Sequence, residues 1–199
     1  MQSLVVSGLS LGRPIVSMRL VRATVNAEQE DSLHEARILL LLGERAARGN
    51  ATIDGITKLA KMDFLLRYPV YLQRLLNETK TAPPKVQMLN FEKDTVESKM
   101  IRFRYGPWDP RYRRWIGLLV AKGLVETYLK GRTVHVRVTS KGRVVASSLI
   151  DRPEFKDLQI RTATVNSAVG GMSGTKLKEL IYKVVPELTG MEWGKEIEQ

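Results

Sequence analysis

A stretch of alternating residues between positions 124 and 138 limits the possible folds more than any other part of this chain. Its valines occupy every second position from Val134 to Val138, and a Lys-Gly-Arg turn at 130–132 divides it. This pattern predicts a β-hairpin with strands at 124–129 and 133–138. Apolar residues at helical spacing come just before it: Tyr112, Trp115, Ile116 and Leu119. The sequence therefore predicts a helix that leads directly into a hairpin.

The ends of these elements carry their own signals. Asp109 suits the N-cap of the first helix, Pro110 suits its first turn, and Gly123 suits its end. After the hairpin, Thr139 or Ser140 suits the N-cap of a second helix over 141–150. We therefore expect a helix, a hairpin and another helix in close succession.

Three more helices are predicted upstream. The first follows a Ser32/Glu35 capping-box pattern and contains the apolar run 38–42, which indicates a buried helix. Apolar residues at helical spacing then predict a helix over 54–67, and Pro69 suits the start of a third helix over 69–78. A buried helix followed by two shorter ones is typical of a helix-turn-helix core.

The helices and the basic hairpin together resemble a winged helix-turn-helix domain. The predicted fold class is therefore mainly α (α+β), with this domain over residues 32–150 and a polar insertion over 79–108 that contains one short strand. Residues 151–199 are predicted to form a separate region of amphipathic helices. Residues 1–31 are either an N-terminal arm or an edge strand, and the sequence leaves both open.

Positive charge is concentrated on the predicted hairpin and its two flanking helices. The chain has a net charge of +11, and residues 111–150 hold nine lysines and arginines but one acid, Glu126, which gives +8. Such a local excess favours a polyanionic partner, DNA above all, although an acidic protein surface would also fit. The candidate DNA contacts are Arg111, Arg113, Arg114, Lys130, Arg132, Arg137, Lys141 and Arg143. We expect them to bind backbone phosphates rather than to read bases.

Nothing in the sequence indicates a catalytic, metal or cofactor site. Cysteine is absent, and His34 and His135 have no partners at metal-ligand spacing. The glycine-rich run at 169–176 places its lysine after the hydroxyl residue, so it fails the phosphate-loop pattern. A fold-assembled cluster of carboxylates or histidines would be needed for an enzyme. We also expect a cytoplasmic protein, because no leader peptide or membrane span is evident.

Two aromatic and apolar groupings leave alternatives. Tyr105, Trp108, Tyr112 and Trp115 could stack bases, but packing of the insertion onto the core is the more common role and the one we favour. Near the C-terminus, Ser173 suits the N-cap of an amphipathic helix. We expect its apolar stripe to bind a partner protein through Leu177, Leu180, Ile181, Val184 and Val185.

This C-terminal stretch also carries a family resemblance. "GTKLKELIYKVVPELTGMEWGKEI" resembles the C-terminal pattern of middle components of ABC-three-component systems, with matches at Gly174, Thr175, Leu177, Lys178, Ile181, Tyr182, Pro186 and Glu187. "ITKLAKMDFLLRYPVYL" and "RYGPWDPRYRRWIGLLVAKGLVE" look similar to the same group, so the resemblance covers roughly residues 32–199.

The resemblance implies a non-enzymatic accessory subunit. Such a subunit works beside a large ATPase of the structural-maintenance-of-chromosomes (SMC) or Rad50 type and an effector such as a nuclease. Lamassu-type antiviral defence against phage and plasmid DNA is one setting. The ATP and metal chemistry would then belong to the partners. The alternative is a free-standing winged-helix transcriptional regulator, which would bind one operator far more tightly than random DNA.

Overall fold

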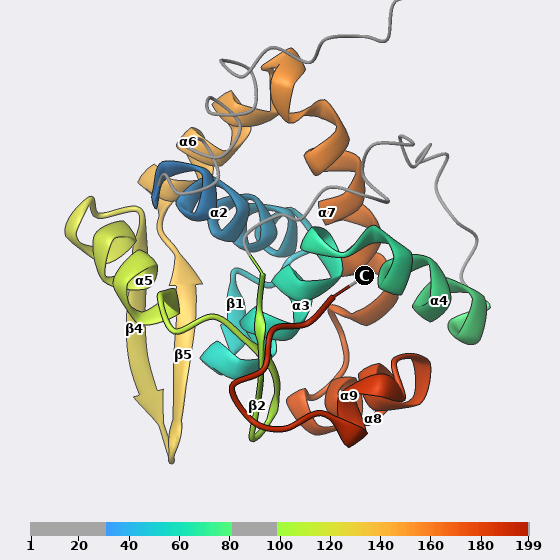
Figure 1. The fold of residues 1–199 in the computed structure, drawn as a ribbon. Coiled ribbons are helices and arrows are strands. Elements are labelled where there is room, and N and C mark those ends of the chain that lie inside the picture. Colours follow the sequence, from blue (N-terminus) through green and yellow to red (C-terminus); the bar gives the residue numbers. More distant parts are fainter. Residues whose placement is uncertain (1–30, 81–98, 199) are drawn as a thin grey trace, which may run out of the picture.

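The longest helix of the described residues, α2 (Asp31–Ala47), packs against several other helices and against two strands of the sheet (Figure 1). The computed structural model describes residues 31–80 and 99–198. The remaining elements follow in chain order: β1 (Thr52–Asp54), α3 (Ile56–Arg67), α4 (Pro69–Thr79), β2 (Ile101–Phe103), β3 (Gly106–Trp108), α5 (Tyr112–Ala121), β4 (Val125–Lys130), β5 (Thr133–Val138), α6 (Ser140–Ile150), a short 3-10 turn (Pro153–Phe155), α7 (Lys156–Val169), α8 (Gly174–Val184) and α9 (Glu187–Gly190).

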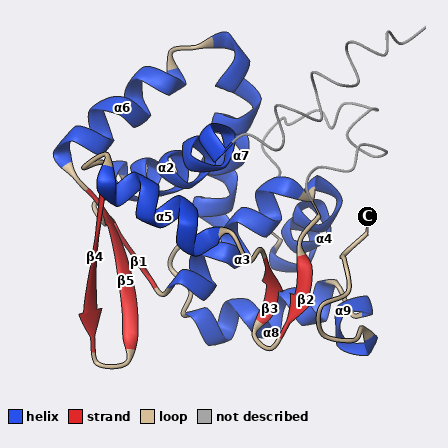
Figure 2. Ribbon diagram, turned by 60° about the vertical axis from the view of Figure 1, so that its left-hand side comes forward, coloured by secondary structure: helices blue, strands red, loops and turns tan. Residues whose placement is uncertain are grey.

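The predicted hairpin is confirmed. Strands β4 and β5 pair antiparallel from Val125 opposite Val138 to Lys130 opposite Thr133. β1 adds to the other side of β5, which gives the strand order β1-β5-β4. Figure 2 shows the β4–β5 hairpin extending away from the helices, with α5 beside its base. The sequence did not predict β1, because three residues are too few for an alternating pattern.

The helices predicted at 54–67 and 69–78 are confirmed by α3 and α4, and the short strand in the insertion is confirmed by β2. Two predicted helix starts are wrong. α2 begins at Asp31, so Ser32 lies inside the helix, and Glu35 pairs with Lys122 rather than with a capping serine. The predicted arm or edge strand lies outside the described residues except for Asp31, as does most of the 79–108 insertion.

The other wrong start is that of α5, which begins at Tyr112 rather than at Pro110. Asp109 still accepts a hydrogen bond from the backbone amide of Arg111, at 3.0 Å. The predicted N-caps Thr139 and Ser173 are confirmed, because their side chains accept hydrogen bonds from the amides of Gly142 and Lys176.

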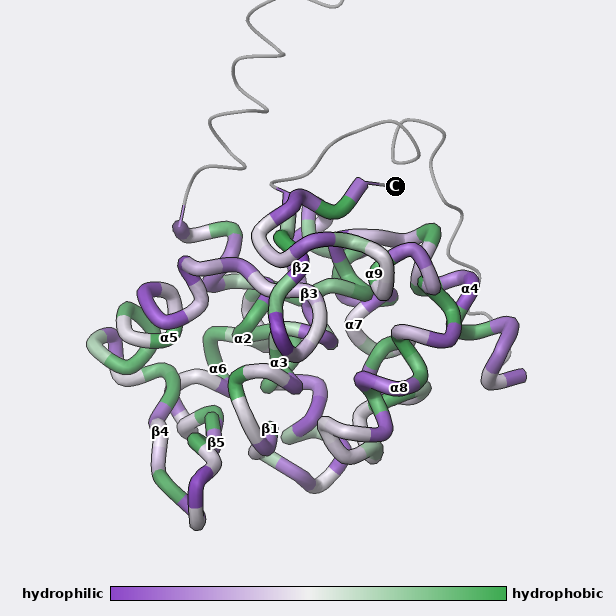
Figure 3. The backbone as a smooth tube through the Cα atoms, turned by 60° about the horizontal axis from the view of Figure 1, so that its bottom comes forward, coloured by the Kyte–Doolittle hydropathy of each residue, from purple (hydrophilic) through white to green (hydrophobic). Residues whose placement is uncertain are grey.

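A single hydrophobic core joins all parts of the described chain. Ile38, Leu41 and Leu42 of α2 are completely buried, and so are Ile53 of β1 and Val136 of β5, which lie opposite each other in the sheet. In Figure 3 the hydrophobic stretches of α2 and α3 lie in the middle of the molecule. The inner face of the sheet therefore covers the same core as the helices.

The C-terminal helices belong to this core, which corrects the expectation of a separate region. α7 packs against α2 and α3, and α8 packs against α3 and α4. Leu177, Ile181 and Val185 are completely buried and Val184 is nearly so; Leu180 is half-buried. The predicted docking stripe is therefore used within the chain, and the partner-binding prediction for its buried residues is wrong in this structure.

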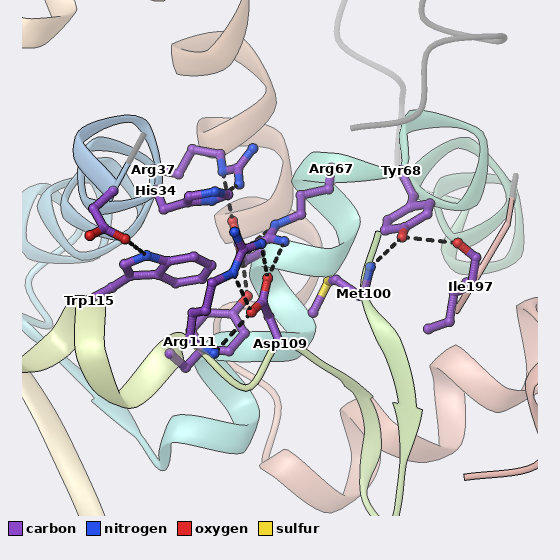
Figure 4. Close-up of polar contacts among 12 residues, drawn as sticks. His34, Arg37, Arg67, Tyr68, Met100, Asp109, Arg111, Trp115 and Ile197 are labelled. Atoms are coloured by element: carbon purple, nitrogen blue, oxygen red, sulfur yellow. Dashed lines mark hydrogen bonds and ion pairs between the residues drawn. The ribbon is translucent and has the colours of Figure 1, made fainter. Parts of the chain in front are cut away.

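The C-terminal segment after α9 ties down the small β2–β3 hairpin. The amide of Ile197 donates to the Met100 carbonyl at 2.8 Å, and the amide of Gly194 donates to the Arg102 carbonyl at 2.7 Å. The Tyr68 hydroxyl joins the same junction, because it accepts from the Met100 amide and donates to the Ile197 carbonyl (Figure 4). The hairpin is thus held against α3 and α4. No helix in residues 31–80 or 99–198 is long and apolar enough to cross a bilayer.

Candidate nucleic-acid interface

Two glycines fix how the β4–β5 hairpin projects from the helices. Gly123 ends α5 with a φ of 68°, a conformation that favours glycine. A Cβ atom on Gly142 would lie 2.0 Å from the Leu124 carbonyl oxygen, so only glycine allows α6 to start so close to the root of β4. The hairpin is therefore held between the end of α5 and the start of α6.

Three of the predicted DNA contacts have no polar partner among the described residues. Lys130 and Arg132 lie at the tip of the hairpin, and Arg113 lies on the first turn of α5; all three side chains are exposed. Lys141 and Arg143 at the start of α6 are also exposed and bond only to neutral groups, the Lys122 carbonyl and the Ser140 hydroxyl. These five cations keep their charge available to an anion.

The other three predicted contacts are paired with carboxylates. Arg111 makes a bidentate contact with Asp109 at 2.9 and 3.0 Å, and its guanidinium lies 4.9 Å from the centre of the Trp115 ring. Arg114 pairs with Asp31 at 2.6 Å. Arg137 pairs with Glu126 on the outer face of the sheet. The structure thus divides the predicted set into five uncompensated and three compensated cations.

Asp109 is one end of a buried ionic network that joins α2, α3 and α5 (Figure 4). Arg67 of α3 donates to Asp109 at 3.0 Å and to Asp63 at 2.8 Å, and Arg37 of α2 lies 3.4 Å from Asp63. The Tyr112 hydroxyl of α5 donates to the same Asp63 carboxylate. The start of α5 is therefore anchored to both central helices by charge-assisted hydrogen bonds.

The pKa values of these groups follow from burial and from their partners. Burial alone would raise the pKa of the Asp63 carboxyl, but the charges of Arg67 and Arg37 outweigh burial and lower it. Burial would also raise the pKa of the Asp109 carboxyl, but the contacts with Arg111 and Arg67 outweigh burial and lower this pKa to about 2. Burial, with the Asp63 charge added, raises the pKa of the Tyr112 phenol well above its usual value. Both carboxylates are thus ionised inside the protein.

His34 completes the inner side of the network. Its ring stacks on Trp115 with centroids 4.0 Å apart, and its Nδ1 atom contacts the Arg37 guanidinium. Burial, followed by the positive charges of Arg37 and Arg67, lowers the pKa of His34 to about 3, so the imidazole is neutral at physiological pH. His135, in contrast, lies on the outer face of the sheet beside Asp54. The two histidines therefore lie in separate parts of the structure and do not form a metal site together.

The predicted aromatic cluster separates into two parts. Tyr112 and Trp115 are completely buried, as the packing interpretation requires. Tyr105 is half exposed and Trp108 is half-buried, and both line a hollow of about 160 Å³ beside the β2–β3 hairpin. The same hollow is lined by Thr57, Phe103, Gly106, Pro107 and Arg113. One of the free cations, Arg113, thus stands at an aromatic surface.

Sequence reasoning missed the inner network and Phe103. The Asp63/Arg67 pair did carry a signal, because an aspartate and an arginine four residues apart lie together on a helix face that is otherwise apolar. Phe103 lies in the short strand that was predicted for the insertion, but the sequence did not indicate that its side chain would be exposed.

The described part of the chain contains no group of three histidine or carboxylate side chains that could hold a metal ion. A second hollow, of about 630 Å³, lies between α4 and the start of α8 and is lined by Thr79, Gly171, Met172, Ser173, Lys176 and Leu180. Leu180 is thus the one member of the predicted docking stripe that borders open space.

No protein-family model, no curated protein and no solved structure matches this chain. The resemblance to middle components of ABC-three-component systems therefore stays a prediction.

Proposed function

We propose that this chain is a winged-helix accessory subunit that binds the phosphate backbone of DNA. The order of its elements supports this proposal: α2, β1 and α3, then α5 after an insertion, then the β4–β5 hairpin, with the strand order β1-β5-β4. In a winged-helix domain the helix before the hairpin faces DNA and the hairpin is the wing. α5 therefore takes the place of the recognition helix, and both α4 and the insertion with its β2–β3 hairpin lie between α3 and α5 in the chain.

The observation that carries the proposal is the cluster of uncompensated cations on this wing and helix. Lys130, Arg132 and Arg113 have no carboxylate partner among the described residues, and Lys141 and Arg143 bond only to neutral groups. Exposed cations of this kind gain affinity by replacing the counterions of DNA phosphates. An acidic protein surface would meet the same groups, and binding of a purified DNA duplex distinguishes the two partners.

The exposed face of α5 favours backbone binding over the reading of bases. Beyond Arg113 and Arg114 it presents Gly117, Val120 and Ala121, none of which carries a side-chain hydrogen-bonding group. A helix that distinguishes base pairs in the major groove usually presents several such groups. This composition supports the accessory subunit over the free-standing regulator.

The setting of this activity follows from the family resemblance. In that setting, an SMC-type ATPase and an effector such as a nuclease supply the chemistry, and this subunit contributes DNA contact. Since the apolar stripe of α8 is used within the chain, the ATPase would bind another surface. Co-purification from the native host, together with the identity of the neighbouring genes, tests this part of the proposal separately from DNA binding.

DNA binding is tested by fluorescence anisotropy with a labelled blunt duplex of random sequence. The double variant Lys130→Glu/Arg132→Glu should weaken binding by at least about tenfold and should lower the salt slope by about 2. Arg152→Glu/Lys156→Glu is a control with the same change in net charge. Both positions are exposed, one just after α6 and the other at the first residue of α7, and these elements lie away from the hairpin tip. This control should retain most of the affinity.

Equal losses in the two double variants would refute the assignment of the wing, because they would reflect net charge alone. Duplexes of different sequence should bind within a few-fold of one another. A preference of about 10³-fold for one sequence would instead support the regulator.

A further inference from the structure

The hollow beside the β2–β3 hairpin differs in character from the basic wing. Phe103 is 43% exposed and Tyr105 is 49% exposed, which is unusual for large aromatic side chains that sit next to each other on a surface. Trp108 lies behind them, with its ring centre 6.3 Å from that of Phe103. Three aromatic residues of one short hairpin thus line a space open to solvent.

The size of this hollow suits one flat ring. Its volume is about 160 Å³, and an engineered cavity of ~150 Å³ in another protein binds benzene. The hollow described here is open on one side, so a ring that enters it can remain attached to a larger molecule outside. A single aromatic ring on a flexible chain is therefore a fitting occupant.

The charge around the hollow selects among such occupants. Arg113 forms one wall and has no polar partner among the described residues. The Arg104 guanidinium lies 5.5 Å from the centre of the Tyr105 ring, and Lys61 lies beneath Gly106. No carboxylate is among the lining residues. Aromatic rings combined with uncompensated arginines favour a base that is attached to a phosphate.

The position of the hollow connects it to the wing. Thr57, on the first turn of α3, lines the hollow. The nearby Gly55 lies against Thr133, the first residue of β5 next to the hairpin tip, where a Cβ on Gly55 would be 3.5 Å from the Thr133 methyl group. On its other side the hollow meets Arg113 of α5. A DNA strand whose phosphates contact the wing would therefore pass close to the opening.

We propose that this hollow binds an unpaired nucleobase, so that the protein prefers DNA with a single-stranded end or gap to an intact duplex. This inference rests on the proposed DNA binding and adds the form of DNA that is recognised. In a continuous duplex both faces of every base are stacked on neighbouring bases, and none is available to Phe103 or Tyr105. A base beyond the end of a duplex has a free face and a flexible backbone.

The test compares two probes by fluorescence anisotropy: a blunt duplex, and the same duplex with a short unpaired oligothymidine tail. The wild-type protein should bind the tailed probe at least about fivefold more tightly, as the stacking of one base predicts. Phe103→Ala and Tyr105→Ala should each reduce this ratio towards one while leaving affinity for the blunt duplex unchanged. A tail that carries 2-aminopurine should also lose fluorescence on binding to the wild-type protein only.

Tyr128→Ala provides a matched control. Tyr128 is also an exposed aromatic residue, at 41%, but it lies on the outer face of the sheet beside Arg137. Its substitution should change affinity for both probes equally and leave their ratio intact.

The outcomes separate the two proposals. If the blunt duplex does not bind, the proposed DNA binding fails; if it binds regardless of Lys130 and Arg132, the assignment of the wing as the binding surface fails. If the blunt duplex binds through the wing but the tail adds nothing, or if the tail acts equally in Phe103→Ala and Tyr105→Ala, the base-binding hollow is refuted. Binding of an uncharged proline-rich peptide that requires Phe103, without an effect of the tail, would refute it in favour of a protein partner.

Discussion

Substitution of Asp63 by asparagine should destabilise the protein more than any change of similar size on its surface. Asp63 is 1% exposed, and it accepts hydrogen bonds from Arg67 and from Tyr112 while Arg37 lies 3.4 Å away. The network holds three guanidiniums, those of Arg37, Arg67 and Arg111, against two carboxylates. Asparagine would leave one carboxylate for all three and would turn an amide group towards the arginines.

The expected magnitude follows from these contacts. Removing one partner of a buried ion pair costs about 3–5 kcal/mol, because the remaining charge is left desolvated. With an m-value of about 2 kcal/mol/M in urea, a loss of about 4 kcal/mol lowers the unfolding midpoint by about 2 M. Urea titrations followed by far-ultraviolet circular dichroism measure this shift.

Glu44→Gln is the matched control on the same helix as Arg37. It breaks the exposed Glu44–Arg48 pair, which spans 2.7 Å and joins residues four positions apart. A pair of this kind contributes about 0.5 kcal/mol. Equal midpoints for Asp63→Asn and Glu44→Gln would refute the argument that the buried network holds the fold. If Asp63→Asn fails to fold, the double variant Asp63→Leu/Arg67→Met should recover part of the stability, because it removes both members of the buried Asp63–Arg67 pair instead of one.

Two other predictions concern the core. Ile181→Ala should lower the free energy of unfolding by about 2–5 kcal/mol, because Ile181 is completely buried. A loss below about 1 kcal/mol would show that α8 does not bury Ile181 in the core and would favour the earlier prediction that α8 binds a partner protein. The second prediction concerns the stability of the protein at low pH. Because the pKa of His34 is about 3 in the folded protein and about 6.5 when unfolded, the unfolded chain binds a proton first, and stability should fall as pH drops below about 6.5 towards 3. Urea titrations across this range should show a weaker dependence on pH in His34→Gln, and an unchanged dependence would contradict the burial of a neutral imidazole.

Local patterns in the sequence were enough to predict the elements that form the wing. The hairpin was visible because one face of β5 is buried, which forces alternation, and because a Lys-Gly-Arg turn divides it. The N-caps Thr139 and Ser173 were visible because a hydroxyl before an apolar run serves the same local purpose in any fold. Such signals depend only on residues that are neighbours in the sequence, so they can be recognised without the tertiary structure.

The surface against which an amphipathic helix packs was not predictable in the same way. The stripe from Leu177 to Val185 indicates that α8 buries one face, but the same pattern serves a partner protein or the chain's own core. In this chain α8 packs against α3 and α4, and the surface that these two helices offer exists only in the assembled fold. The network was hidden for a related reason, since Asp63 and Asp109 are separated by α4 and the insertion and meet only through Arg67.

The structure also changes what the charge of the wing region predicts. Of the nine lysines and arginines in residues 111–150, four are paired with carboxylates: Arg111 with Asp109, Arg114 with Asp31, Lys122 with Glu35 and Arg137 with Glu126. Five remain to meet phosphates. Since each neutralised phosphate contributes about 0.9 to the slope of log K against log salt, the slope should approach about −4.5 if the pairs persist and about −8 if binding opens them all.

These two slopes can be told apart in one anisotropy titration series. The pair between Arg111 and Asp109 is part of the buried network and should persist, whereas Arg114 is 69% exposed and could exchange Asp31 for a phosphate at little cost. Asp31→Asn should therefore steepen the slope by up to about 1 if Asp31 competes with DNA for Arg114. A wild-type slope near −8 would show instead that the carboxylates do not hold these arginines, and the division of the wing into free and paired cations would be wrong.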